Sequence, residues 1–176
     1  RSLQRRWISP EHRKKGLFRI ADGSGIGKAI CVPGPSTNLD LTEHDLQHIP
    51  DAKLPEGFRF HDATDDDLEN LADVHNHSFT NKWNAELYGK VFRSPYQEYE
   101  IVTIAPDGRF ASFTQVWVDD VNKSILFEPV GTHSDFRRRG IGKAMMVYVL
   151  KRMQAEHNII RAYVCHELPD KNVASG

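Results

Sequence analysis

The sequence has little cysteine, no long hydrophobic run and almost no charge imbalance, and each shortage excludes a class of protein. Its two cysteines, Cys31 and Cys165, lie far apart and form no metal-ligand pattern, so we expect a reduced, cytoplasmic protein. No apolar run approaches the ~20 residues that cross a bilayer, and residues 1–7 lack the apolar core of a secretory signal. Lys and Arg number 23 against 24 for Asp and Glu, so the net charge is −1. This balance argues against nucleic acid or a membrane as the partner.

The 176 residues form one regular segment preceded by an irregular one. Residues 1–53 are rich in Pro, Gly and charge and too poor in apolar residues to fold alone. We interpret them as a linker or as the remnant of a preceding domain. Residues 54–176 have the regular hydrophobic pattern of a domain with its own core. Because the chain begins with Arg1 and ends at Gly176 without a closing hydrophobic element, we expect it to be part of a longer protein.

The hydrophobic residues of this domain recur with the spacings of strands and helices. Strands are predicted at residues 57–61, 99–104, 110–118, 124–131 and 159–165, and helices at residues 64–79, 85–92 and 140–157. Short turns, among them Asp107-Gly108, separate the three middle strands and predict an antiparallel meander. The fold class is therefore α/β (α+β), with a mixed, mainly antiparallel central sheet flanked by helices.

The last predicted strand, residues 159–165, carries apolar residues without alternation, which is typical of a strand buried on both faces. Since the chain ends soon after it, we expect one edge of this strand to be left unpaired by the chain itself. An exposed apolar edge promotes aggregation. We therefore expect a further segment or a second chain to cover it, and we regard the fold as incomplete at its C-terminus.

The segment from Phe127 to Met145 combines a strand, a basic loop with two glycines and the start of a helix. A helix N-terminus presents unpaired N–H groups and a partial positive charge, which favour a bound phosphate. Gly140 and Gly142 let the backbone approach a bulky anion, and Arg side chains can hold phosphate oxygens in pairs. Physical chemistry alone therefore predicts a diphosphate-binding turn without naming its ligand.

The spacing Arg137-x-x-Gly140-x-Gly142 resembles the Gln/Arg-x-x-Gly-x-Gly/Ala signature of the GNAT N-acetyltransferase superfamily. The preceding run from Glu128 to His133 and the amphipathic helix behind the signature are similar to the same family. The resemblance covers residues 54–176 and is strongest to the C-terminal halves of tandem GNAT proteins such as mycothiol synthase. It implies a GNAT fold and an acetyl-CoA-dependent N-acetyltransferase. The implied acceptor is a primary amine on a small molecule or a peptide, and a homodimer is compatible with the resemblance.

The resemblance also assigns roles to individual residues. The backbone of Val130, Gly131 and Thr132 would pair with the pantetheine arm of acetyl-CoA. The turn that would hold the diphosphate consists of Arg137, Arg138, Arg139, Gly140, Ile141, Gly142 and Lys143. Asn172, at the start of a following helix, would lie near the pantetheine. The family's usual general acid is a Tyr a few residues beyond that Asn, and this sequence ends before any such Tyr.

Transfer of an acetyl group to an ammonium acceptor needs a base to remove a proton and donors to stabilise the tetrahedral oxyanion. Glu128 is the predicted base. On a regular strand it would share a face with Val130 and Thr132, and its apolar neighbours would raise its pKa. His166 and Glu167 after the last strand, or a base acting through a water molecule, are alternatives. The other interpretation of Glu128 is a solvated strand residue or a salt-bridge partner.

Other patterns predict no further site. The pairs His44 and His48, and His75 and His77, lack a third and fourth ligand nearby in the sequence, so we expect solvated histidines and no metal. The main alternative function is a non-catalytic acyl-CoA-binding module, which one half of a tandem GNAT protein can become. Nucleic-acid binding through residues 137–139 is disfavoured by the near-neutral charge and by the lack of aromatic residues for stacking.

Overall fold

The computed structural model describes residues 18–21, 27–31, 38–41, 46, 48–79, 82–93 and 99–165. The chain divides into two compact units, one of residues 1–39 and 165–176 and the other of residues 40–164. In the first unit, strands β1 (Phe18–Ala21) and β2 (Gly27–Cys31) pair antiparallel in a two-stranded sheet. The basic glycine turn belongs to the second unit.

The second sheet has six strands in the order β3-β8-β7-β6-β5-β4. These strands are β3 (Asn38–Leu41), β4 (Arg59–Asp62), β5 (Tyr99–Ile104), β6 (Phe110–Asp119), β7 (Ser124–Thr132) and β8 (Arg161–Cys165). Neighbouring strands from β4 to β7 are antiparallel, and β8 is parallel to β7. The predicted fold class, a mixed and mainly antiparallel sheet with helices, is confirmed.

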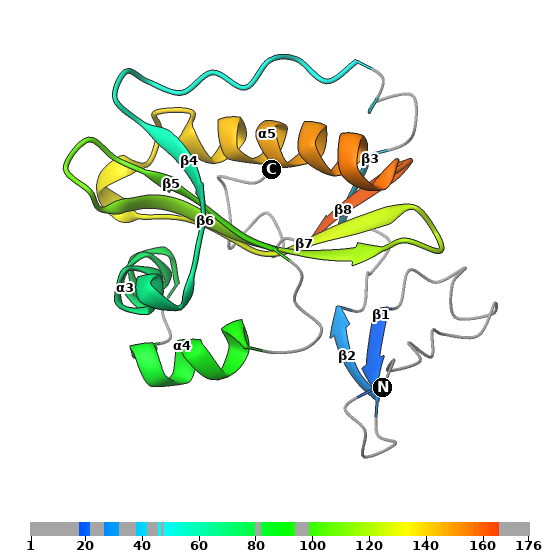
Figure 1. Cartoon of the computed structure of the whole chain (residues 1–176), viewed down its shortest axis with the longest axis horizontal. Coiled ribbons are helices and arrows are strands. Elements are labelled where there is room, and N and C mark those ends of the chain that lie inside the picture. The colour runs from blue at the N-terminus through cyan, green and yellow to red at the C-terminus, as the bar shows by residue number, and fades with distance from the viewer. Residues whose placement is uncertain are drawn as a thin grey trace. The chain divides into compact units, whose positions relative to one another are not determined.

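Helices cover both faces of this sheet (Figure 1). On one face lie α3 (Leu68–Ser78), which follows the 3-10 turn η1 (Asp65–Asp67), and α4 (Ala85–Phe92). On the other face lies α5 (Ile141–His157), which follows the 3-10 turn η2 (Ser134–Phe136). Among the described residues, no helix is long and apolar enough to cross a membrane.

Alternation along the strands divides the buried side chains between the two helical layers. Val102 and Phe113 belong to the cluster that contains the buried residues of α3 and α4. Ile101 and Val116 belong to the cluster that contains Met145 and other buried residues of α5. Each strand residue can therefore be assigned to the α3–α4 face or to the α5 face.

Local sequence explains where the helices begin. The carboxylate of Asp67 accepts hydrogen bonds from the N–H and the hydroxyl of Thr64, at 2.8 and 3.0 Å, in the manner of a capping box. The side chain of Asn84 accepts the N–H of Leu87 at 2.8 Å and caps α4. α5 begins after Gly140, whose φ of +74° is in the left-handed region that glycine adopts without strain.

The expectation that the last strand has an open edge is wrong. β3 lies next to β8 in the sheet, so residues 38–41 of this chain supply the strand that covers the edge. The sequence could not show this pairing, because these residues are far from β8 along the chain. β8 is also not buried on both faces, since Arg161 is exposed and Ile160 just before it is 39% exposed.

Candidate functional site

A bulge in β7 sets the direction of Glu128. Glu128 and Pro129 together lie opposite the single residue Gln115 of β6, because the register between the two strands shifts there. Proline has no N–H to donate to the ladder, and a bulge accommodates it within a sheet. Phe127 and Val130 consequently both pack in the α5 cluster, although they are three positions apart. Glu128, the neighbour of Phe127, therefore faces the α3–α4 side of the sheet.

The expectation that Glu128 shares a face with Val130 and Thr132 is wrong, because the bulge adds a residue that a regular strand does not have. The expectation that burial raises its pKa is supported. Desolvation raises the pKa of Glu128 from 4.5 to about 7. Among the described residues, no side chain or N–H group forms a hydrogen bond or ion pair with this carboxylate. A carboxylate with such a pKa can accept and release a proton near neutral pH.

The turn between β7 and α5 presents exposed cations and free helix N–H groups. Gly140 is the N-cap of α5 and provides no side-chain acceptor for the first helical N–H groups. Arg138, Arg139 and Lys143 are exposed, and no carboxylate in the described part of the chain pairs with them. The guanidinium of Arg139 lies over the ring of Phe136, 5.5 Å from its centroid. This combination suits a bound anion.

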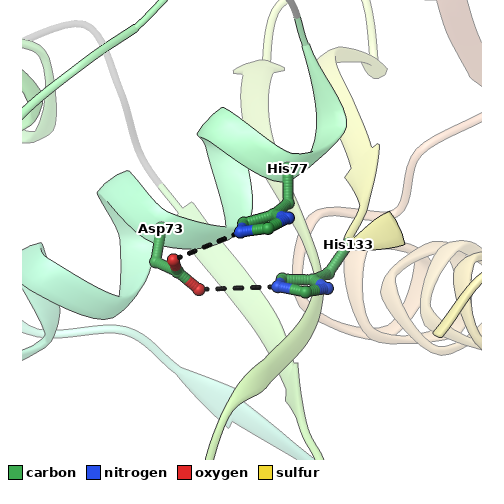
Figure 2. Close-up of side chains that lie close together, drawn as sticks. All are labelled: Asp73, His77 and His133. Carbon is green, nitrogen blue, oxygen red and sulfur yellow. Dashed lines mark ion pairs between the residues drawn. The ribbon is translucent and has the colours of Figure 1, made fainter. Parts of the chain in front are cut away.

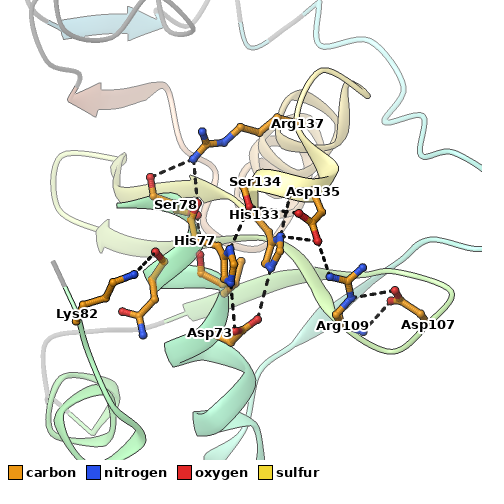
Figure 3. Close-up of polar contacts among 12 residues, drawn as sticks. Asp73, His77, Ser78, Lys82, Asp107, Arg109, His133, Ser134, Asp135 and Arg137 are labelled. Atoms are coloured by element: carbon orange, nitrogen blue, oxygen red, sulfur yellow. Dashed lines mark hydrogen bonds and ion pairs between the residues drawn. The ribbon is translucent and has the colours of Figure 1, made fainter. Parts of the chain in front are cut away.

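Arg137 differs from its neighbours because its side chain binds the protein itself (Figure 3). Its Nη2 donates to the main-chain oxygens of His77 and Ser78 at 2.9 and 3.4 Å, and its Nε donates to the main-chain oxygen of Thr132 at 3.2 Å. The first two oxygens belong to the last turn of α3, which lacks intrahelical donors. Arg137 therefore joins the C-terminus of α3 to the end of β7.

Two glycines have close neighbours at the point where a side chain would begin. A Cβ atom at Gly131 would lie 2.3 Å from Cε1 of Phe113 and 2.6 Å from Oγ of Ser78. The packing of β7 against α3 therefore needs glycine at this position. A Cβ atom at Gly142 would lie 2.9 Å from Oγ1 of Thr132, which is less than an ordinary contact.

The predicted cofactor-binding residues fall in two consecutive stretches and one distant position. The stretches are Val130, Gly131 and Thr132 at the end of β7, and Arg137, Arg138, Arg139, Gly140, Ile141, Gly142 and Lys143 after η2 and at the start of α5. The side chain of Ile141 is buried in the core, so only its main chain faces the turn. Asn172 and the alternative bases His166 and Glu167 lie outside the described residues.

Sequence reasoning missed three residues that the structure brings forward. Trp117 of β6 donates its indole N–H to the main-chain oxygen of Glu128 at 2.8 Å. This hydrogen bond spans the bulge in β7. The sequence signal for the bulge was Pro129, because a proline inside a central strand indicates an irregularity. Asp73 and His133 converge with His77, which was considered only together with His75. The i, i+4 spacing of Asp73 and His77 was visible, but the contribution of His133 depends on the tertiary fold.

Comparison with known proteins places this geometry in a family. Residues 68–175, more than half of the chain, match the model of the acetyltransferase (GNAT) family. A search of the curated proteins gives no match. This chain spans 42% to 60% of the length of three of the solved structures that it resembles.

Three solved structures illustrate the likeness. A tandem GNAT protein from the clavulanic acid biosynthesis pathway is 14% identical, with a TM-score of 0.62 over 90% of this chain and 57% of that chain. A spermidine N-acetyltransferase from Vibrio cholerae is 11% identical, with a TM-score of 0.54 over 69% of this chain and 76% of that one. A GNAT family N-acetyltransferase from Escherichia coli in complex with CoA is 12% identical, with a TM-score of 0.50 over 58% and 59%. At these identities the likeness shows a shared fold.

Proposed function

Because this chain belongs to the acetyltransferase (GNAT) family, we propose that it transfers an acetyl group from acetyl-CoA to a primary amine, with Glu128 as the base. The amine attacks the thioester directly within a ternary complex. The observation that carries the proposal is the partly buried carboxylate of Glu128, whose pKa of about 7 is unusual for a glutamate. It lies on the strand that leads into the basic glycine turn.

The turn at residues 137–143 would hold the diphosphate of acetyl-CoA. Its exposed cations, which no carboxylate among the described residues pairs with, support this assignment, as does the N-terminus of α5, which has no side-chain cap. The CoA complex of a structural relative supports it as well. The main chain of Val130, Gly131 and Thr132 would hold the pantetheine arm, and Asn172 would lie near it. Arg137 would act mainly by fixing the end of β7, because its donors already bind main-chain oxygens.

The chemistry requires removal of one proton before attack. At neutral pH the acceptor is an ammonium ion, and Glu128 accepts its proton directly or through a water molecule. The neutral nitrogen then adds to the thioester carbonyl carbon. When the carbon–sulfur bond breaks, the second proton lost by the nitrogen goes to the departing sulfur, so the products are an amide and a thiol. A base with a pKa near 7 is partly ionised at neutral pH yet basic enough to take up the proton.

A negatively charged base also favours a cationic acceptor. A small polyamine or a peptide amine would fit, and a structural relative is named for its action on spermidine. A second candidate function is acyl-CoA binding without catalysis, as one half of a tandem protein. The similarity to a tandem GNAT protein over 90% of this chain supports this alternative.

The experiment measures free thiol release from acetyl-CoA with a panel of amines, comparing the wild type with Glu128→Gln. We expect wild-type turnover with at least one amine and a loss of about 100-fold in kcat in the variant. Affinity for acetyl-CoA, measured by calorimetry, should change less than about twofold, because Glu128 acts on the acceptor. Glu69→Gln, which removes an exposed carboxylate on α3, is the matched control.

The outcomes separate the two candidates. Turnover that survives Glu128→Gln would show that another group is the base. Tight binding of acetyl-CoA without turnover of any amine would favour the non-catalytic alternative. No binding of acetyl-CoA or CoA, seen as no thermal shift where linkage predicts about 2.7 kcal/mol at a 100-fold excess over Kd, would reject both.

A further inference from the structure

Asp73, His77 and His133 bring three potential metal ligands to one point on the surface (Figure 2). Asp73 and His77 are one turn apart on α3, and His133 directly follows β7. Nε2 of His77 lies 3.7 Å and Nε2 of His133 lies 3.6 Å from the carboxylate oxygens of Asp73. One ligand atom from each residue lies within 4.8 Å of the others. We propose that this cluster, here called the Asp73 cluster, binds a divalent transition-metal ion of the Zn²⁺ type.

The two long distances show that the three groups do not satisfy one another. Separations of 3.6 and 3.7 Å exceed the range of N–H···O hydrogen bonds. The side chain of His133 is only 2% exposed, and its Nε2 forms no hydrogen bond within the described part of the chain. Among the described residues, the only fully buried side-chain nitrogen or oxygen without a partner is Nδ1 of His75, so Nε2 of His133 keeps some contact with solvent. Its direction toward Asp73 and His77 is what points to a ligand between them.

The surroundings of His77 already suit metal binding. Its Nδ1 lies 3.0 Å from Oγ of Ser134, and that hydroxyl can donate to Oδ1 of Asp135 at 3.4 Å. The hydroxyl oxygen then accepts the Nδ1 proton of His77, which leaves the Nε2 lone pair facing Asp73. Metal-binding histidines commonly donate their second ring N–H to such an oxygen, which fixes the tautomer and the ring.

His133 must change tautomer to bind the ion. Its Nδ1 now accepts the N–H of Asp135 at 3.1 Å, which places the proton of the neutral ring on Nε2. If the proton lies on Nδ1 instead, a small rotation of the His133 ring would direct this N–H group to the carboxylate of Asp135. Oδ2 of Asp135 is 4.0 Å from Nδ1. The neutral ring keeps its single proton in this exchange. Burial and the neighbouring His77 lower the pKa of His133, although Asp135 and Asp73 oppose this.

Binding also requires a small closure of the ligands. The rings of His77 and His133 stack nearly parallel, with centroids 3.9 Å apart and an interplanar angle of 18°. Zn²⁺ binds imidazole nitrogen at ~2.0–2.1 Å and carboxylate oxygen at ~2.0–2.2 Å, so one ring must tilt toward the ion. His77 and Asp73 are the ligands that can move, because their side chains are 46% and 52% exposed. His133 is buried, so it moves least of the three.

The ligand chemistry selects the class of ion. Two imidazoles and one carboxylate suit Zn²⁺, Co²⁺, Ni²⁺ or Cu²⁺, whereas Mg²⁺ and Ca²⁺ prefer oxygen ligands. Three protein ligands would leave a fourth position for water. The Asp73 cluster includes neither Glu128 nor a side chain of the basic turn, so this proposal does not depend on the proposed acetyltransferase activity. It departs from the expectation of no metal, which was based on histidines near one another in the sequence.

The test is a titration of the 176-residue chain with Zn²⁺ by calorimetry, and with Co²⁺ by visible absorption. We expect the wild type to bind one Zn²⁺ per chain. In Asp73→Asn and in His77→Ala, the affinity for Zn²⁺ should fall at least about tenfold or binding should be lost. The Co²⁺ complex should show ligand-field bands of a four-coordinate site that disappear in the same variants. Both replaced side chains are exposed, so folding should be retained, and circular dichroism checks this.

Two controls keep the result specific. Glu69→Gln removes an exposed carboxylate from the same helix, and His61→Gln removes an imidazole that pairs with the single carboxylate Asp67. Neither should change the affinity for Zn²⁺ by more than about twofold. The proposal is wrong if the wild type binds neither ion, or if the double variant Asp73→Asn/His77→Ala retains wild-type affinity. In the latter case the bound ion lies elsewhere on the chain.

Discussion

Trp117 on β6 holds Glu128 on β7 through one hydrogen bond across the bulge, from its indole N–H to the main-chain oxygen of Glu128 at 2.8 Å. The main-chain hydrogen bonds between two strands are interrupted at a bulge. The bond from Trp117 therefore provides a link between β6 and β7 where such a main-chain bond is absent. Trp117 is therefore a positioning residue. We predict that this bond helps to hold the Glu128 carboxylate in the direction that the bulge sets.

Trp117→Phe tests that role, because it keeps an aromatic ring and removes only the donor. We expect a loss of about 1 kcal/mol in the free energy of unfolding. We also expect kcat to fall several-fold while the affinity for acetyl-CoA is unchanged. Trp83→Phe is the control, since the indole of Trp83 stacks on His75 of α3 at 4.2 Å and contacts Tyr88 of α4. Equal kcat in the wild type and Trp117→Phe would mean that the bulge keeps its geometry without this bond.

The pKa of Glu128 predicts that activity and stability change in opposite directions with pH. The folded-state pKa is raised from 4.5 to about 7, so the folded chain binds more protons than the unfolded one between these values. The free energy of unfolding therefore falls as pH rises through this window. The full difference corresponds to ~3 kcal/mol, and residual solvent exposure reduces it to about 2 kcal/mol. Activity should instead rise as Glu128 ionises.

Glu128→Gln should remove this pH dependence. Urea unfolding at pH 5 and pH 8 measures it, and the variant should be more stable than the wild type at pH 8 although it is nearly inactive. A variant that is less stable than the wild type at pH 8 would show that the carboxylate has a stabilising partner when acetyl-CoA is absent.

The arginines of the turn should separate into one structural and one ligand-binding group. Arg137→Gln should lower the free energy of unfolding by about 1–2 kcal/mol, because main-chain oxygens at the ends of α3 and β7 lose a charged donor. Arg138→Gln should leave stability unchanged and weaken acetyl-CoA binding, because Arg138 is exposed and has no carboxylate partner among the described residues. Denaturation and calorimetry on both variants test the division. The opposite pattern would assign Arg137 to the phosphates.

His75 predicts a loss of stability at acidic pH. Its ring is buried against Trp83, and its Nδ1 has no hydrogen-bond partner in the described part of the chain. Desolvation lowers the pKa of His75, although Asn76 opposes this. The unfolded chain then binds a proton that the folded chain excludes, so stability falls as pH drops below ~6.5, the pKa of an unperturbed histidine.

His75→Phe should reduce this acid sensitivity and retain stacking on Trp83. Thermal unfolding of the wild type and the variant between pH 5 and pH 7.5 measures it. Since the substitution also removes an unsatisfied nitrogen, stability at pH 7 should rise by up to about 1 kcal/mol. If the variant loses stability at acidic pH more steeply than the wild type, other histidines cause the acid sensitivity.

The sequence predicted most elements because their signals are local. The bounds of residues 85–92 and 99–104 coincide with α4 and β5, where an Asn84 cap and a run of apolar residues define the ends. The direction of Glu128 could not be predicted by counting residues, because the bulge at Pro129 adds one position and reverses the alternation. Strand β3 and the partnership of His133 with Asp73 depend on contacts between distant segments, which hydrophobic periodicity does not encode.

The packing around Gly131 has a consequence for comparing this chain with its relatives. Any side chain at this position would collide with Phe113 and Ser78, so the fold itself requires glycine there. Under the proposed function, a homologue that lost acetyl transfer would therefore still retain Gly131, whereas Glu128 would be free to change. A diverged homologue that keeps this glycine has preserved its architecture, which by itself is no evidence for the proposed activity.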